Sequence, residues 1–314
     1  MPLDHGDIVR SIGLAGGARS AVAASWNRSL LVHRLDPDRI QTHTFADAHS
    51  CLTARERMGR IAAIAAPAMD RLFAAVGAGG CSVLLTDGAG VVVDRRGCPG
   101  DDAAFQHWGL WTGADWSEAA AGTNGIGTCV VEQRPVVVHR DQHFASNNIA
   151  MSCMGAPIFD HEGELAGVLD ISSCRADLAD AFVALLADAV SDAARRIEAE
   201  NFQAAYAGRR IVVGPGDSSA GAVLFAVDRD DLLVGATRRA RKTYCLTTDV
   251  FANPRPASVV LEQNRAEVAD LDAAERGALR RAIASANGNA SLAARALGIS
   301  RATLYRRMAR VGLR

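Results

Sequence analysis

The stretch NASLAARALGISRATLYRRMARVG, residues 289–312, decides the fold of the C-terminal part of this chain. Asn289 and Ser300 have short side chains that accept hydrogen bonds from the first turn of a helix, so each predicts a helix start. Gly298 tolerates the left-handed backbone at a helix end, and Ile299 fills the space between the two helices. The stretch therefore predicts two short helices joined by a tight turn, a helix-turn-helix.

Apolar residues recur on one face of these helices and of a helix expected over residues 273–286. They are Leu279, Ile283, Leu292, Ala293, Ala296, Leu297, Leu304, Met308 and Val311. Three- and four-residue spacing places such residues on one buried stripe. We therefore expect residues 271–314 to form an all-α domain.

The solvent face of this domain is strongly basic. From Asp272 onward the chain has nine arginines, and its only acidic residues are Asp272 and Glu275. This charge suits the phosphates of double-stranded DNA, with the start of the last helix in the major groove. We assign base contacts to Arg301, Thr303 and Arg306. Phosphate contacts are expected at Arg295, Ser300, Tyr305 and Arg307. The alternative is a solvated basic face on a three-helix bundle.

The composition of the whole chain bounds its class. At 314 residues, with 49% hydrophobic and 22% charged residues, it is long and apolar enough for two or more compact domains. Its first residues do not resemble a signal peptide, and no apolar run approaches the ~18 residues of a membrane span. Its seven cysteines contain no C-x-x-C pair, which favours reduced thiols and no structural metal site. We expect a cytoplasmic, nucleoid-associated protein without a membrane partner.

Residues 53–203 predict a domain with an antiparallel sheet and flanking helices, which makes the fold class α+β. Thr53 is expected to cap a long helix through Val76. Strands are expected at residues 81–86, 91–94, 126–131, 135–139, 153–159 and 165–172. A helix over residues 178–202 carries the stripe Phe182, Leu186, Ala189, Ala193 and Ile197. Its length favours pairing with a second copy, so we expect a homodimer.

The remaining segments are shorter. Residues 1–52 form an N-terminal helical segment, with a helix expected over residues 18–31. Residues 204–252 predict a small unit of strands followed by a basic helix at residues 238–244. The run Asn-Pro-Arg-Pro at residues 253–256 breaks regular structure and begins a linker through residue 270.

A loop rich in Gly, Asp and Trp lies between the predicted strands. Its aromatic rings can close over a small organic ligand, or they can fasten the loop to the core. The residues at which we expect ligand contacts are Trp111, Trp116, Asn124, Cys129, His143, Asn148 and Cys153. Cys129 and Cys153 fall in predicted apolar strands, where thiols are usually inert.

Two further motifs look like a nucleotide site and a metal site, but we interpret neither as one. Gly122–Thr128, GTNGIGT, superficially suggests a nucleotide loop, but we expect no strand before it and no helix after it, so it is interpreted as a turn that shapes a pocket. His139 and His143 are four residues apart, yet His139 ends a predicted strand, so the two need not share a face. We predict no metal site.

These motifs carry two resemblances. Residues 287–313 closely resemble the C-terminal DNA-binding domain of the Fis family, shared by NtrC-class activators, and this implies DNA binding as a dimer. WSEAAAGTNGIGT (116–128), RPVVVHRDQHF (134–144) and CMGAPIFDHEGELAGVLDIS (153–172) resemble the GAF domain of regulators of the acetoin-catabolism type. AASWNRSL (23–30) and the PAS-like stretch over residues 222–241 match the order of segments in that family.

One departure from that family limits the mechanism. The family places an AAA+ ATPase between sensor and tail, and none fits between Gly208 and Asp272. A Walker A loop also needs a lysine after glycine, whereas the single lysine, Lys242, follows Arg241. We therefore expect a ligand-responsive transcriptional regulator that works without ATP-driven sigma-factor activation. A small-molecule effector and RNA polymerase are its further candidate partners; the sequence indicates no cofactor.

Two alternatives from other classes stay open. A GAF-fold thiol enzyme, such as a reductase of free methionine sulfoxide, needs two or three thiols that converge in one exposed pocket. The scattered cysteines and the basic tail argue against it, so we assign no catalytic residues. A ligand-independent architectural protein of the nucleoid needs only the tail and a dimerising front part.

Overall fold

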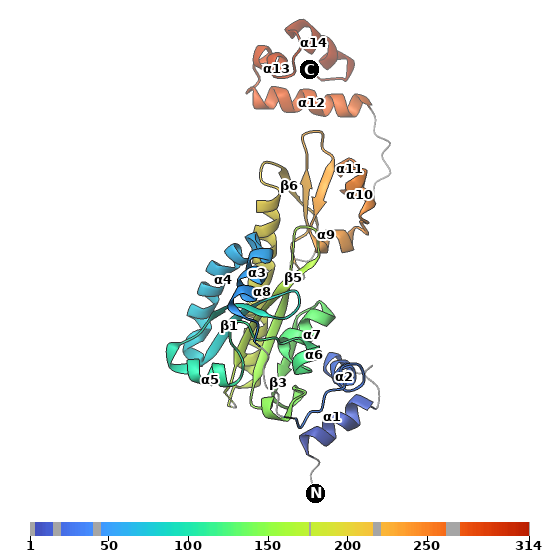
Figure 1. Cartoon of the computed structure of the whole chain (residues 1–314). Helices are drawn as coiled ribbons and strands as arrows, with labels where there is room; N and C mark the ends of the chain where they lie inside the picture. Colours follow the sequence, from blue (N-terminus) through green and yellow to red (C-terminus); the bar gives the residue numbers. More distant parts are fainter. Residues whose placement is uncertain are drawn as a thin grey trace. The chain divides into compact units, whose positions relative to one another are not determined.

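The computed structural model describes residues 4–14, 20–39, 45–175, 177–215, 221–261 and 271–313 (Figure 1). They belong to two compact units, Met1–Ala257 and Ser258–Arg314. The first unit mixes sheets and helices and the second is helical, which confirms the predicted α+β class.

A five-stranded antiparallel sheet forms the centre of the first unit, in the order β2-β1-β5-β4-β3. Its strands are β1 (Cys81–Asp87), β2 (Val92–Arg96), β3 (Val136–His139), β4 (Ser152–Phe159) and β5 (Leu165–Ser173). Side chains alternate between the two faces of a strand. As a result, Met154, Leu169 and Ile171 face one core and Cys153 faces another.

Helices α4 (Arg60–Val76) and α8 (Asp180–Ala205) cover one face of this sheet (Figure 1). The shared core includes Met69, Leu85 and Leu186. Residues 60–79 are long and apolar enough to cross a membrane by length and composition alone, although Asp70 and Arg71 interrupt the apolar run. The apolar face of α4 packs on the sheet, because a helix that is apolar on one face needs such a partner.

The predicted single helix from Thr53 to Val76 is wrong. Helix α3 (Ala48–Met58) begins earlier, because the carboxylate of Asp47 accepts a hydrogen bond of 2.7 Å from the Ser50 amide. Gly59 then ends α3 at φ +53° before α4 begins. A positive φ is strained for other residues, so Gly59 separates the two helices.

The opposite face of the sheet carries α5 (Asp102–His107), α6 (Glu118–Ala121) and α7 (Gly125–Glu132). The strand predicted at residues 126–131 is therefore wrong, and so is the prediction that no helix follows Gly122–Thr128. Asn124 starts α7, since its Oδ1 accepts hydrogen bonds from the amides of Ile126 and Gly127 at 2.9 and 2.8 Å. A cap of this kind outweighs the β preference of a short apolar run.

The N-terminal segment packs on the same unit. It consists of α1 (His5–Leu14), α2 (Ala21–Asn27) and a π-helical turn at Arg28–Val32. Val9, Trp26 and Phe144 share a small core. Part of the helix expected over residues 18–31 lies outside the described residues. Short 3₁₀ turns complete the unit at Gly77–Gly79, Pro99–Asp101, Arg140–Gln142 and Ser146–Asn148.

A second, three-stranded sheet packs against the end of α8. Its antiparallel order is β6 (Arg210–Val213), β7 (Leu224–Val227) and β8 (Leu233–Ala236). Phe202 of α8 shares a core with Leu224 and Ala226. Helices α9 (Arg238–Thr243), α10 (Asp249–Ala252) and α11 (Ala257–Leu261) follow. Because α11 falls within the predicted linker of residues 253–270, that linker is partly helical; residues 262–270 lie outside the described ranges.

The stripe on which the dimer expectation depended is occupied within the same chain. Leu186 and Ile197 are buried in the core between α8 and the large sheet. Phe182, Ala189 and Ala193 are partly buried against that core. The homodimer therefore stays a prediction that needs a different surface.

Within the second unit, α12 (Leu271–Ser285), α13 (Ala290–Ala296) and α14 (Arg301–Arg310) form a three-helix domain. Leu279, Ala293 and Leu304 lie in its core, as expected. The expected inward face of α13 is partly wrong, because Leu292 is 50% exposed while Ala294 is buried. The small Ala293 and Ala294 side chains permit close packing of the three helices.

Candidate functional site

The turn between α13 and α14 has the predicted capping geometry. Asn289 Oδ1 accepts from the amides of Ser291 and Leu292 at 3.0 and 3.2 Å. Ser300 Oγ accepts from the Thr303 amide at 3.1 Å. Gly298 has φ +65°, the left-handed conformation expected there. These contacts mark the starts of α13 and α14 and the turn between them.

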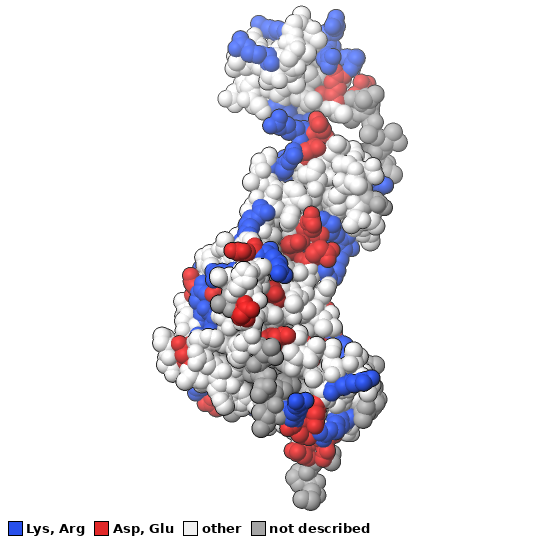
Figure 2. Space-filling model, in the orientation of Figure 1, with Lys and Arg blue, Asp and Glu red and all other residues white. Residues whose placement is uncertain are grey.

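The side chains assigned to DNA lie on the outside of this domain, where Figure 2 shows several arginines in blue. Thr303 is half-buried and the other assigned residues are exposed: Arg295, Ser300, Arg301, Tyr305, Arg306 and Arg307. The Arg301 guanidinium lies 5.6 Å from the ring centre of Tyr305, which holds the two side chains together.

Arg307 differs from Arg301 and Arg306 because it has an acidic partner within the domain. Its Nη1 lies 3.4 Å from Glu275 Oε1, and Arg310 pairs with the same carboxylate. Arg276 instead donates through Nε to the Val311 carbonyl at 2.7 Å. Glu275 therefore competes with a phosphate for Arg307, whereas Arg301 and Arg306 are better placed for recognition.

Several side chains assigned to ligand binding make hydrogen bonds within the protein fold. The Asn124 amide donates to the carbonyls of Trp116 and Gly122 at 2.9 Å each, while its oxygen caps α7. Trp116 is 1% exposed and donates through Nε1 to the Gly109 carbonyl at 2.9 Å. Both side chains hold the loop on the sheet. Trp111 is half-buried, and the Arg95 guanidinium lies 4.1 Å from its ring centre.

The structure brings two other predicted residues together on the α7 side of the sheet. His143 Nε2 lies 3.4 Å from Cys153 Sγ. His143 Nδ1 lies 3.0 Å from the Arg140 carbonyl, an oxygen that only accepts, so Nδ1 carries the proton and Nε2 accepts from the thiol. Burial lowers the pKa of His143 to about 4, so the imidazole is neutral at pH 7.

Sequence reasoning missed two members of this buried cluster, Asp170 and Ser172. Ser172 Oγ lies 2.5 Å from Asp170 Oδ2 and 3.2 Å from Cys153 Sγ. Burial raises the pKa of Asp170 to about 7. The signal was present in the strand LAGVLDIS, where Asp170 and Ser172 alternate with apolar residues and so share one face.

Asp170 Oδ1 in this cluster has no hydrogen-bond partner among the described residues, and neither does Asn148 Oδ1. Both side chains are almost fully buried. Space around Asp170 is tight, because a Cβ built on Gly125 lies 2.6 Å from Cys153 Cβ and 3.0 Å from Asp170 Oδ1. Unpaired buried acceptors of this kind suit a small ligand that donates hydrogen bonds, provided that α7 moves outward.

A second polar network, also missed, joins the N-terminal segment to α6 and α7. Glu118 is 2% exposed and accepts from Arg28 Nε and Nη2 at 2.7 and 2.8 Å. Ser25 Oγ donates to Glu118 at 2.6 Å and lies within 3.1 Å of the Thr123 and Thr128 hydroxyls. The hydrogen bonds to Glu118 raise the pKa of Arg28. This network connects the motifs AASWNRSL and WSEAAAGTNGIGT.

The two thiols assigned to ligand binding, Cys129 and Cys153, are buried and do not form an exposed reactive site. Cys129 lies in α7, contrary to the predicted strand, and its Sγ is 3.3 Å from the Arg134 carbonyl. Burial raises the pKa of Cys129 and Cys153 well above the usual thiol range. Since the thiolate is the reactive form, both groups are unreactive where they stand.

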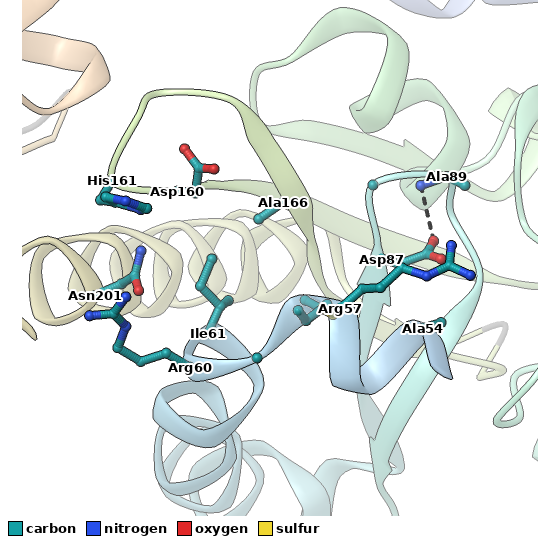
Figure 3. Close-up of a pocket in the computed structure, with 13 residues that line it drawn as sticks. Ala54, Arg57, Arg60, Ile61, Asp87, Ala89, Asp160, His161, Ala166 and Asn201 are labelled. Carbon is teal, nitrogen blue, oxygen red and sulfur yellow. Dashed lines mark hydrogen bonds between the residues drawn. The ribbon is translucent and has the colours of Figure 1, made fainter. Parts of the chain in front are cut away.

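A cavity of about 550 Å³ lies between the start of α4, the β1–β2 turn and the end of α8 (Figure 3). Its lining mixes cations and anions, with Arg57 and Arg60 against Asp87 and Asp160. Asp87 is held by the amide of Ala89 at 3.0 Å, the contact dashed in Figure 3. Mixed charge of this kind gives no preference for a ligand of one sign.

Comparison with known proteins matches two segments of the chain to known families. Residues 60–197 match the GAF domain, and residues 270–310 match the family model for bacterial regulatory proteins of the Fis family. The acetoin catabolism regulatory protein of Cupriavidus necator is 35% identical over 69% of this chain and 33% of its own length. The acetoin dehydrogenase operon transcriptional activator AcoR of Bacillus subtilis is 35% identical over 42% of this chain and 22% of its own length.

This chain thus spans a third or less of these curated relatives. The crystal structure of the E. coli DhaR(N)-DhaL complex contains a chain with a TM-score of 0.53 and 15% identity, which covers 77% of this chain and 84% of that one and shows a shared fold. The two matched segments leave residues 198–269 between them. The chain therefore combines a GAF domain with a C-terminal helix-turn-helix of the Fis family of bacterial regulatory proteins.

Proposed function

We propose that this protein is a transcriptional regulator that binds DNA through α14 and responds to a small molecule in its GAF domain. The observation that carries the proposal is the exposed basic face of α13 and α14, two helices whose first turns are capped by Asn289 and Ser300. The relatives named as regulators and activators of transcription support it.

In the DNA complex, Arg301, Thr303 and Arg306 contact base edges in the major groove. Arg295, Ser300, Tyr305 and Arg307 contact phosphates. The exposure of most of these side chains supports the assignment, and the Glu275 pair makes Arg307 the weakest contact.

The effector binds on the α7 side of the large sheet, near His143, Asn148 and Cys153. The unpaired oxygens of Asp170 and Asn148 favour a neutral ligand with hydroxyl donors, because a neutral His143 offers no positive charge to an anion. Acetoin, a small hydroxy-ketone, is the first compound to test, since it appears in the names of two relatives. Trp111, Trp116, Asn124 and Cys129 then act by holding the surrounding loop and helix.

The protein acts on transcription without ATP-driven activation of a sigma factor. The described residues between the two matched segments form the end of α8, a small sheet and α9 to α11. This arrangement supports direct contact with RNA polymerase or occlusion of a promoter. We further propose that the protein is a cytoplasmic, nucleoid-associated homodimer, that it is not an enzyme, and that residues 204–252 are a PAS-like unit.

The test measures retardation of a labelled DNA fragment from upstream of the gene, with the full chain at several salt concentrations. A scrambled fragment of equal length is the control. Acetoin and a panel of small alcohols, ketones, aldehydes and aromatics are then added. We expect specific retardation that at least one compound changes. If no fragment is retarded specifically at any salt, the proposal is wrong; specific binding that no ligand alters favours the architectural alternative.

A further inference from the structure

A second cavity, of about 300 Å³, lies between the GAF domain and α9 of the small unit. Its walls come from β4, from the turn after α7, from α8 and from α9, all within the first compact unit. Pro135, Pro157 and Phe159 give it an apolar side. A volume of this size suits a small organic molecule.

The charged lining of this cavity is almost entirely positive. Five of its residues are basic: Arg134, Arg195, Arg238, Arg239 and Lys242. The acidic lining residue, Glu198, is partly buried and accepts from the Phe159 amide at 2.9 Å. Burial raises its pKa to about 7, so its negative charge is incomplete near neutral pH. The positive groups around this cavity repel each other, and a bound anion would reduce that repulsion.

Three of the five basic residues are already engaged. Arg238 stacks on the Phe159 ring at 3.8 Å and donates to Gln133 Oε1 at 2.7 Å. Arg195 pairs with Asp192, and Arg134 Nε lies 3.5 Å from Glu132. These contacts hold Arg134 and Arg195 on the GAF side of the cavity and Arg238 on the α9 side.

Arg239 and Lys242 on α9 are different. Among the described residues, the buried Arg239 Nε has no hydrogen-bond partner, and neither side chain has an acidic partner within ion-pair distance. They are three residues apart in one helix and therefore lie side by side. Burial and the neighbouring Arg238 and Arg239 lower the pKa of Lys242. The carboxylates of the β4–β5 turn act on Arg241, which does not line the cavity.

We propose that this cavity binds a small organic anion, a carboxylate or a phosphate, with its charged group between Arg239 and Lys242. The apolar part of the ligand lies against Pro135, Pro157 and Phe159. Because Arg134 and Arg195 belong to the GAF domain and Arg239 and Lys242 to α9, a bound anion bridges the two parts. This anion site is separate from the proposed effector site, which lies on the α7 side of the large sheet. A bound anion would therefore be a second signal to the regulator.

Lys242 is the only lysine in the sequence, which gives a direct probe. Full-length protein made with lysine carrying ¹³C at Cε shows a single lysine ε-methylene signal by NMR. Sodium pyrophosphate is titrated in, with sodium chloride at equal ionic strength as the reference. Sodium benzoate forms a second arm that tells a carboxylate preference from a phosphate preference. No DNA is present, so the result is independent of DNA binding.

We expect a saturable shift of this signal with one of the two anions. Arg239→Gln weakens that binding at least tenfold, and Arg134→Gln weakens it from the GAF side. Arg57→Gln, in the cavity of mixed charge shown in Figure 3, leaves it unchanged. The proposal is overturned if chloride gives the same shift as both anions, or if Arg239→Gln and Arg134→Gln bind like the unmodified protein.

Discussion

The C-terminal domain and the interior of the GAF domain use polar side chains in opposite ways. In the C-terminal domain, Arg301 and Arg306 are exposed and the small core beneath them is apolar. In the GAF domain, Glu118 and Asp170 are buried and surrounded by other polar groups. Exposed groups are available for a partner at little cost to stability, whereas buried ones also determine whether the domain folds.

Replacing Glu118 tests the buried side of this comparison most strongly. Glu118→Ala removes the carboxylate that pairs with Arg28 and accepts from Ser25, and leaves a partly buried cation without its main partner. We expect the free energy of unfolding to fall by about 3 to 4 kcal/mol. Denaturant unfolding of the full chain measures this. Arg175→Gln, which breaks an exposed pair with Asp177, is the control and has little effect. If both variants lowered the free energy of unfolding equally, buried and exposed polar groups would not differ as described.

The protonation of Asp170 gives a pH test. Its pKa is about 7 in the folded protein and about 3.9 in an unfolded chain. Between these values the folded state keeps a proton that the unfolded state has released, so rising pH lowers stability. Relative to Asp170→Asn, the unmodified protein should lose up to about 3 kcal/mol between pH 4 and pH 7. Thermal unfolding across this range checks it.

His143, whose pKa is depressed, contributes the opposite slope in both proteins, so it cancels in this comparison. Asp177→Asn is the control, because the pKa of Asp177 is lowered and that residue titrates below the window. A difference between the unmodified protein and Asp170→Asn that does not change with pH would show that Asp170 is charged in the fold.

The close packing of α7 on the sheet can be tested with one methyl group. Gly125→Ala places a Cβ 2.6 Å from Cys153 Cβ, so α7 or β4 has to shift. We expect a loss of about 1–3 kcal/mol in the free energy of unfolding. Gly100→Ala meets nothing within 4 Å and serves as the matched control. Full stability of Gly125→Ala would mean that the interior is looser than described, with room for a ligand in the resting state.

Replacing Arg306 tests the exposed side. Arg306→Ala should weaken specific DNA binding by about 1–3 kcal/mol and leave the unfolding midpoint unchanged. Fluorescence anisotropy on the upstream fragment and its scrambled version measures the specific part. Unchanged affinity for both fragments would mean that α14 does not enter the groove as assigned.

The smallest effect is expected at Arg307. Because Glu275 already pairs with it, Arg307→Ala should reduce affinity by less than Arg306→Ala, about 0.5 kcal/mol, and equally for both fragments. The salt dependence of binding should also become slightly less steep. A larger loss than that of Arg306→Ala would reverse the assigned order of contacts.

Local patterns predicted the C-terminal domain well. The caps at Asn289 and Ser300 and the turn at Gly298 lie within a few residues of the helices that they start or end. The GAF interior was harder. Asn124 was expected to contact a ligand but caps α7, and the pair of Glu118 with Arg28 joins residues 90 positions apart. No local pattern reports such a contact.

The sequence alone determined the helix-turn-helix, the strands of both sheets and the basic surface of the tail. It also predicted a strand at residues 126–131, which lie in a helix. Short-range hydrogen bonds and the spacing of apolar residues encode these features. Only the tertiary structure decided that residues 125–132 form a helix, that His143 meets Cys153 and Asp170 stays unpaired on one side, and that Arg239 and Lys242 face a cavity. Those properties depend on burial and on contacts between distant segments, which exist only once the chain has folded.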